Sequence, residues 1–179
     1  MDYKRTLLSQ ILDSIGQKPI IILFGARQVG KTTLIKEIIK NFKIALYLEG
    51  DDPKTAQLFE GRSSLELAQV VLGHDLVVID EAQRIKNIGT VLKLIADNVP
   101  QVNVLATGSS SFELANKLSE PLTGRNRKLF LYPLSLKELV DTYTKMNVEK
   151  KIEEYLIFGM YPQIVSGDGR QKKIQLLKD

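Results

Sequence analysis

Eight consecutive residues have the types and the spacing needed to hold a phosphate. Residues 25–32 are Gly-Ala-Arg-Gln-Val-Gly-Lys-Thr, which fits the pattern G-x-x-x-x-G-K-[ST]. Glycines let the backbone curl until successive N–H groups face a phosphate, and the helix that follows adds its positive N-terminal end. We expect Lys31 to reach the β and γ phosphates and the Thr32 hydroxyl to bind magnesium, whose other ligands are phosphate oxygens and water. The predicted nucleotide-binding residues are Gly25, Ala26, Arg27, Gln28, Val29, Gly30, Lys31, Thr32 and Thr33.

Two adjacent carboxylates, Asp80 and Glu81, follow an apolar run at residues 76–79. Ligands of open α/β sheets gather at the carboxyl ends of the strands, so we expect both side chains to face the same crevice as Lys31. Asp80 is the candidate to hold magnesium, directly or through water, and Glu81 to orient and deprotonate the water that attacks the γ phosphate. The alternative is a helix N-cap or a solvated turn. The phosphate motif favours the catalytic role, because the two motifs converge on one cleft in the expected chain order.

Polar residues also end the apolar run at residues 102–106. The Thr107 hydroxyl is placed to hold the attacking water or to sense the γ phosphate, and Ser109 is nearly as well placed. The competing interpretation makes residues 109–111 helix caps, a role that suits Ser110, three residues before Glu113.

Two arginines, Arg125 and Arg127, follow Thr123 and Gly124. A guanidinium can donate two bonds to phosphate oxygens and stabilise the transition state of phosphoryl transfer, on its own nucleotide or on a neighbour's. The alternative is an ordinary surface arginine beside a glycine. The predicted catalytic residues are then Glu81, Lys31, Thr107 and Arg125, and the predicted metal ligands are Thr32 and Asp80.

Alternating strands and helices are predicted around these motifs. The β-branched run 19–24 predicts a strand buried on both faces of a parallel sheet, and helical spacing returns from Lys31 to Phe42. A buried strand before the loop and a helix after it are the context that the phosphate motif requires. Further strands are expected at 44–48, 76–79, 102–106 and 128–132, and helices at 3–15, from Pro53 through Leu72, at 90–98 and at 110–118.

The pattern becomes helical after Pro133. Ser135 and Glu138 have the spacing of a capping box and predict a helix to about Met146, followed by a second helical stretch at 148–158. We therefore expect a phosphate-binding core at 1–133, an α/β/α sandwich with helices on both faces of a mainly parallel sheet, and the start of a helical appendage at 134–179. The final helical pattern has no capping signal, so we expect the chain to be part of a longer protein.

Composition excludes several other classes. With 179 residues, 44% of them hydrophobic, the chain has the size and balance of one globular domain. It has no cysteine, which excludes a disulfide framework and disfavours structural zinc, and the one histidine, His74, is expected in a turn. The sequence has no apolar run long enough for a membrane span and no apolar stretch typical of a signal peptide, so we expect a cytoplasmic protein. The net charge of +4 is spread along the chain and by itself indicates little about nucleic acid.

Taken together, the motifs resemble those of the AAA-related P-loop ATPases of bacteria and archaea that are usually fused to a C-terminal domain of unknown function. The likeness rests on residues 25–34, 76–83, 107–110, 122–125 and 133–138. It implies ATP as the nucleotide, a sheet of order 5-1-4-3-2, Glu81 as catalytic base beside Asp80, and Arg125 as a candidate arginine finger. Two departures are Ala26, where proline is more usual, and residues 158–162, which only partly match a Gly-Gly-aromatic-Pro turn.

Three functions are consistent with these residues. The leading hypothesis is magnesium-dependent ATP hydrolysis coupled to conformational change, with occupancy of the γ-phosphate site communicated through Thr107, Ser109 and Arg125 to the helical appendage. A second is a small-molecule kinase, for which the sequence shows no acceptor pocket. A third is a nucleotide-gated module that binds nucleic acid or protein with little hydrolysis, which the pI of 9.2 keeps open. An arginine acting between subunits would also require self-association.

Overall fold

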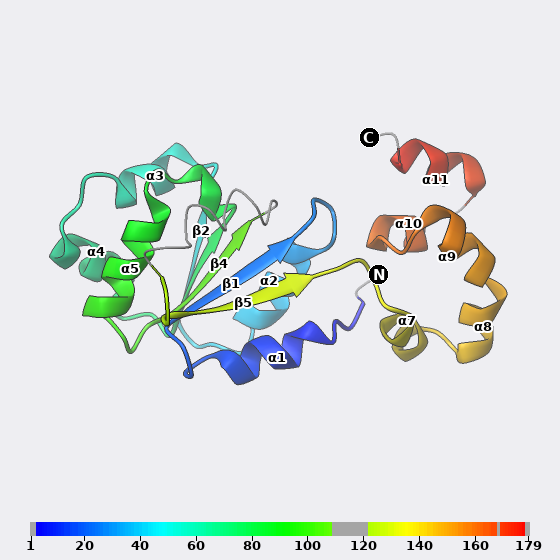
Figure 1. Ribbon diagram of the computed structural model, residues 1–179, viewed down its shortest axis with the longest axis horizontal. Helices are drawn as coiled ribbons and strands as arrows, with labels where there is room; N and C mark the ends of the chain where they lie inside the picture. Colours follow the sequence, from blue (N-terminus) through cyan, green and yellow to red (C-terminus); the bar gives the residue numbers. More distant parts are fainter. Residues whose placement is uncertain (1–2, 109–121, 168, 178–179) are drawn as a thin grey trace.

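A five-stranded parallel sheet forms the centre of the molecule (Figure 1). The computed structural model describes residues 3–108, 122–167 and 169–177. The strands are β1 (Ile20–Gly25), β2 (Ala45–Glu49), β3 (Leu76–Asp80), β4 (Asn103–Gly108) and β5 (Asn126–Leu131). Their order, β2-β3-β4-β1-β5, is the predicted order viewed from the other edge, and each pairing of neighbours is parallel. The predicted fold class is therefore confirmed.

Helices cover both faces of the sheet, which explains why β1, and β3 up to Asp80, are apolar rather than alternating, whereas the edge strand β5 begins with Asn-Arg-Lys. On one face lie α1 (Leu7–Ser14) and α2 (Lys31–Ile39), and on the other lie α3 (Pro53–Phe59), α4 (Ser64–Val71) and α5 (Ile88–Asn98). The buried residues of α1 and α2 pack on one set of strand side chains, which includes Ile21, Leu23, Val78 and Leu105. The opposite set, which includes Ile20, Ile22, Phe24, Val77 and Val104, belongs to the core under α4 and α5.

Local capping determines where several helices begin. The Asp52 carboxylate accepts a bond from the Lys54 backbone N–H at 2.9 Å, and Pro53 occupies the first turn, so α3 begins where the predicted helix from Pro53 begins. Ser63 and Glu66 form a capping box at the start of α4 that the sequence analysis did not identify. His74 lies in a turn and its Nδ1 is 3.1 Å from the Val71 carbonyl oxygen, as expected of a turn residue.

The region after β5 is helical, with α7 (Leu136–Thr142), α8 (Lys145–Lys150), α9 (Ile152–Phe158), α10 (Pro162–Ser166) and α11 (Arg170–Leu176). We call residues 134–176 the helical region. The predicted capping box of Ser135 and Glu138 is present, but the single helix to Met146 is wrong. The chain becomes extended at Tyr143, and the Thr144 side chain caps α8 by accepting from the Asn147 N–H. A polar cap inside the run therefore overrode the helical spacing.

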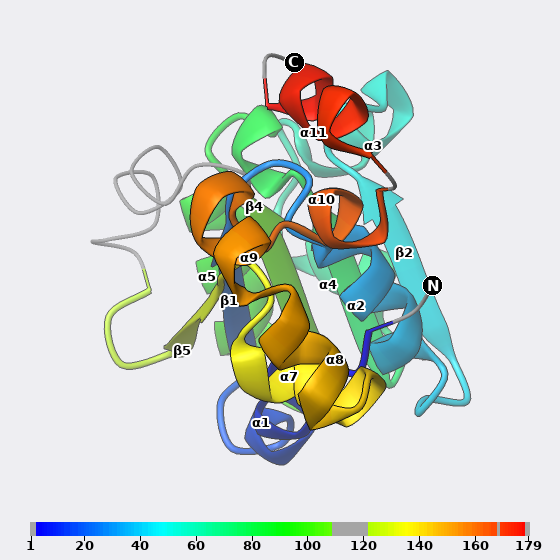
Figure 2. The same ribbon diagram turned by 90° about the vertical axis from the view of Figure 1, so that its right-hand side faces the viewer.

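The helical region lies beyond the carboxyl ends of the strands (Figures 1 and 2). Its small core contains Leu134, Leu139, Val148, Tyr155 and Val165, against which Tyr3 of the N-terminal segment also packs. No helix within the described ranges is both long and apolar enough to cross a bilayer. The helix predicted at 110–118, together with Ser109 and Ser110, lies outside the described residues.

Candidate functional site

The phosphate loop, residues 25–32, turns sharply between β1 and α2. Two of its residues have positive φ: Gln28 at 61° and Gly30 at 102°. At Gly25 the backbone lies so close to β5 that an added Cβ would be 2.9 Å from the Leu131 carbonyl oxygen. Gly25 is therefore needed for close packing and Gly30 for its left-handed conformation, and both requirements follow from glycine having no side chain.

Lys31 lies at the start of α2 and is 7% exposed. Its Nζ donates to the carbonyl oxygens of Gly25 at 3.0 Å and Ala26 at 3.1 Å, and lies 4.0 Å from Glu81 Oε1. Burial lowers the pKa of Lys31, although the nearby carboxylates of Glu81 and Asp80 oppose the shift. The ammonium group is thus held over the loop by two carbonyls, which are weak partners compared with a phosphate.

Asp80 is almost completely buried and accepts several hydrogen bonds. Its Oδ2 accepts from the Thr32 hydroxyl at 3.2 Å and from the Tyr47 hydroxyl at 2.9 Å. Its Oδ1 accepts from the Thr107 hydroxyl and from the Glu81 N–H. The predicted metal ligands Thr32 and Asp80 are therefore brought together, and they present the hard oxygen donors that suit magnesium.

Tyr47, on β2, is a residue that the sequence analysis missed. Burial and the hydrogen bond to Asp80 both raise the pKa of Tyr47, so the hydroxyl remains a donor to that carboxylate. Because β2 pairs with β3 in parallel register, a polar side chain near the end of β2 lies beside the acidic end of β3. Once the strand order is known, the adjacency of β2 and β3 is the signal that could identify Tyr47 as a partner of Asp80.

Glu81 directly follows β3 in a left-handed conformation, with φ of 48°. One carboxylate oxygen accepts from Gln83 Nε2 at 2.5 Å, and the side chain keeps 30% of its surface exposed. Gly50 lies directly beside this turn: its N–H donates to the Asp80 carbonyl at 2.7 Å, and a Cβ there would be 2.4 Å from the Glu81 carbonyl oxygen. The direction of the Glu81 side chain thus depends on the absence of a side chain at residue 50.

Thr107 is fully buried at the end of β4. Its hydroxyl donates to Asp80 and lies 3.3 Å from the Glu81 N–H, from which it accepts. In this arrangement the hydroxyl connects the two acidic residues. A role in sensing the γ phosphate stays a prediction.

Arg125 is not brought to the site. It precedes β5, whose first residue, Asn126, pairs with Ile20, whereas the phosphate loop begins at the opposite end of β1, where Gly25 pairs with Leu131. Five residue steps along β1 separate those ends by roughly 16 Å. Arg125 instead forms an ion pair with Asp97 at 2.5 Å. The predicted action on its own nucleotide, and the predicted route from the nucleotide through Arg125 to the helical region, therefore do not fit this geometry.

Arg127 is likewise remote, because it pairs with Ile21 near the same end of β5. Action of either arginine on a neighbouring molecule stays a prediction.

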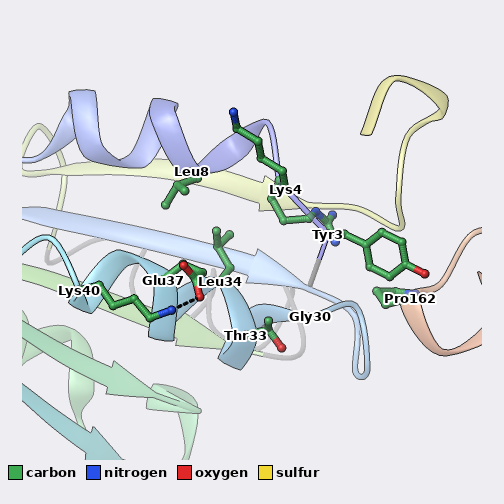
Figure 3. A pocket seen from close by; sticks show the side chains of 10 residues that line it. Tyr3, Lys4, Leu8, Gly30, Thr33, Leu34, Glu37, Lys40 and Pro162 are labelled. Carbon is green, nitrogen blue, oxygen red and sulfur yellow. Dashed lines mark hydrogen bonds and ion pairs between the residues drawn. The ribbon is translucent and has the colours of Figure 1, made fainter. Parts of the chain in front are cut away.

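Two adjoining cavities surround the phosphate loop. The first, about 520 Å³, is lined by residues 27–28 and 30–33, by Glu81, and by Pro162 and Gln163 of the helical region. The second, about 420 Å³, is lined by residues 3–5, by Leu8 of α1, by side chains along α2 from Thr33 to its C-cap Lys40, and by Gly30 and Pro162 (Figure 3). Gly30, Thr33 and Pro162 line both. The two cavities are therefore neighbours, with Lys31 lining the first and the apolar side chains of Leu8 and Leu34 among those lining the second.

Residues 17–140 match the family described as AAA domain. This chain belongs to that family. At the family level it is therefore an AAA-related P-loop ATPase domain, as the resemblance of its motifs implied.

Curated relatives of this AAA domain are longer proteins. The uncharacterized protein MJ1544 of Methanocaldococcus jannaschii is 29% identical over 175 residues, which are 89% of this chain and 39% of that protein. The uncharacterized protein Rv2008c of Mycobacterium tuberculosis is 29% identical over 141 residues, 76% of this chain and 30% of that protein. The chain thus spans less than half the length of these relatives.

Solved structures share the fold of this AAA domain. The Walker-type ATPase PABY2304 of Pyrococcus abyssi has a TM-score of 0.68 at 18% identity, covering 99% of this chain and 73% of that one. The signal transduction ATPase PH0952 of Pyrococcus horikoshii, which carries a tetratricopeptide repeat sensor, has a TM-score of 0.63 at 16% identity, covering 100% of this chain and 33% of that one.

Proposed function

We propose that this AAA domain binds Mg-ATP on the phosphate loop, hydrolyses it with Glu81 as the general base, and couples this cycle to movement of the helical region. The observation that carries the proposal is the cavity of about 520 Å³ in which the loop, Glu81 and Pro162 meet. A cation, a hydroxyl beside a buried carboxylate, and a partly exposed carboxylate surround one space of suitable size for a triphosphate.

The proposed reaction is attack of a water molecule on the γ phosphorus, with the protein groups acting as follows. Lys31 exchanges its two carbonyl partners for oxygens of the β and γ phosphates and stabilises the charge that develops on them. Glu81 accepts a proton from water as its oxygen bonds to the γ phosphorus and the bond to the β–γ bridging oxygen breaks. The proton then passes to the inorganic phosphate product. Magnesium held by Thr32 and Asp80 would supply further neutralisation of phosphate charge.

The adjoining cavity of about 420 Å³ supports a place for the base and sugar, since it opens from Gly30 and Thr33 (Figure 3). ATP is proposed rather than GTP on family grounds, and the sequence contains no Asn-Lys-x-Asp motif of guanine-binding proteins. Pro162 lines both cavities, which supports coupling between nucleotide and helical region.

The magnesium part of the proposal is tested by Asp80→Asn. Calorimetry with wild-type protein should give an ATP affinity about tenfold weaker in EDTA than in magnesium, because the metal links the phosphates to Asp80 and Thr32. Asp80→Asn should bind ATP equally weakly in both buffers, and Asp13→Asn, an exposed change on α1, should behave like wild type. A full magnesium response in Asp80→Asn would exclude Asp80 as a metal-site residue.

The position of Glu81 is tested by Gly50→Ala. The added methyl group must displace the Glu81 backbone, since the two would be 2.4 Å apart, and a misplaced base should slow hydrolysis by roughly 10- to 100-fold. Steady-state phosphate release measures the rate, and calorimetry should show ATP affinity close to wild type because the phosphate loop is untouched. A wild-type rate in a folded Gly50→Ala protein would show that the exact direction of residue 81 does not limit hydrolysis.

A further inference from the structure

A buried arginine, Arg5, connects the phosphate loop to the helical region. Its guanidinium donates from Nη1 to the Val29 carbonyl oxygen at 3.0 Å, from Nη2 to the Tyr132 carbonyl oxygen, and from Nε to Glu138 Oε1 at 3.2 Å. These acceptors belong to the phosphate loop, to the residue that follows β5, and to α7. One side chain thus spans three segments that are far apart in the sequence and is only 9% exposed.

Glu138 holds the far end of this connection. Its Oε1 accepts from Arg5 and from the N–H and hydroxyl of Thr6, while Oε2 accepts from the N–H and hydroxyl of Ser135 at the start of α7. Burial opposes the charge, but the N–H groups of Ser135 and Thr6 and the nearby Arg5 keep the pKa of Glu138 below its usual value. Glu138 therefore completes the capping box of α7 and is also the partner of Arg5.

The N-terminal segment is attached to the helical region on a second side. Tyr3 packs against the small core of that region, and its hydroxyl lies 3.2 Å from the Tyr143 hydroxyl. Residues 3–6 thus contact the helical region, while the guanidinium of Arg5 also bonds the phosphate loop.

Arg5 bonds the peptide unit between Val29 and Gly30, which carries one of the N–H groups of the phosphate loop. The Val29 carbonyl and the Gly30 N–H belong to the same planar peptide, so a bond to the carbonyl oxygen fixes the direction of the N–H and polarises it. In a loop of this kind the N–H groups bind phosphate. A phosphate that accepts a hydrogen bond from the Gly30 N–H therefore affects, through one rigid peptide, the hydrogen bond between the Val29 carbonyl and Arg5.

We propose that Arg5 is the positioning residue that couples phosphate occupancy to the helical region, through the Val29–Gly30 peptide on one side and Glu138 on the other. The inference rests on the proposed binding of Mg-ATP by the loop. Coupling of this kind is reciprocal: phosphate binding steadies α7, and an attached α7 strengthens phosphate binding.

The test compares Arg5→Lys with wild type by calorimetry and by amide hydrogen exchange in the full chain. In wild type, Mg-ATP should slow exchange both in the phosphate loop and at the amides of α7. Lysine keeps the charge but lacks the three-way geometry, so Arg5→Lys should bind Mg-ATP about tenfold more weakly and lose the nucleotide-dependent protection of α7 while keeping that of the loop. Arg62→Lys is the matched control, because Arg62 also bonds a backbone carbonyl, that of Gln57, but lies between α3 and α4.

Glu138→Gln provides a second variant that leaves the contact of Arg5 with the loop in place. It should lose the nucleotide-dependent protection of α7 with a smaller loss of affinity than Arg5→Lys, and it decides the question if Arg5→Lys does not fold. Wild-type nucleotide-dependent protection of α7 in both variants, or in the one that folds, would overturn the role of Arg5. Failure of the wild-type chain to bind Mg-ATP would instead overturn the proposed function, and this inference with it.

Discussion

Replacing Lys31 with alanine should weaken Mg-ATP binding by about 100-fold, the largest loss expected from any single change to the phosphate loop. A hydrogen bond between charged groups contributes about 1.5–3 kcal/mol, and Lys31 would direct such bonds at two phosphates. The side chain is already buried and aimed over the loop, so little reordering is needed when the nucleotide arrives. Isothermal titration calorimetry in magnesium measures the change.

Lys36→Ala is the matched control for this variant, because Lys36 lies on the exposed side of the same helix. It removes one positive charge with a similar small gain in helix propensity, but should leave ATP affinity within about twofold of wild type, as expected for a screened surface charge. Equal affinities for Lys31→Ala and wild type would exclude residues 25–32 as the phosphate site.

Replacing Glu81 with glutamine should lower the rate of ATP hydrolysis by about 100-fold or more and leave ATP binding nearly unchanged. Loss of a general base typically costs 10²- to 10⁴-fold in rate, and glutamine keeps the size of the side chain but cannot accept the proton. The loss of the negative charge near Lys31 slightly favours nucleotide binding. Steady-state phosphate release and calorimetry separate the two effects.

An exposed acidic residue at the end of α3, Glu60, provides the comparison for Glu81. Glu60→Gln should hydrolyse ATP at the wild-type rate. If Glu81→Gln hydrolysed ATP as fast as Glu60→Gln, another group would have to be the base, and the proposed mechanism would lose its central residue.

The parts of the fold that the sequence predicted are those set by local pattern. The run at 19–24 is apolar because both faces of β1 are covered, and that burial leaves a direct trace in the residue types. The phosphate loop and the residues after β3 could be predicted for a similar reason, because the residues that act together are close in sequence or follow the carboxyl ends of strands.

The contacts that could not be predicted join residues that are far apart in the chain. Arg5 and Glu138 are separated by 133 positions, and Tyr47 meets Asp80 across two strands. Neither pairing has a local sequence pattern. Glu138 is already accounted for by its capping box and Tyr47 by its place in a strand, so neither residue indicates a distant partner. Gly50 is similar, because only the approach of the Glu81 backbone distinguishes it from an ordinary loop glycine.

The sequence contains the information needed to exclude Arg125 from the site of its own subunit. A residue that precedes a parallel strand lies at the amino edge of the sheet, whereas the residues that end or follow β1, β3 and β4 lie at the carboxyl edge. The parallel topology that correctly gathered Lys31, Asp80 and Thr107 therefore separates Arg125 from them by the length of a strand. Chain direction, applied to all the candidates, would have excluded it from the site of its own subunit.

Pro162 has a consequence for the timing of the proposed cycle. Since it borders both cavities beside Gly30, a nucleotide that fills them would contact α10, and departure of the diphosphate would depend on the position of that helix. A contact that holds α10 in place would then lengthen the residence time of the diphosphate without changing the rate of bond cleavage.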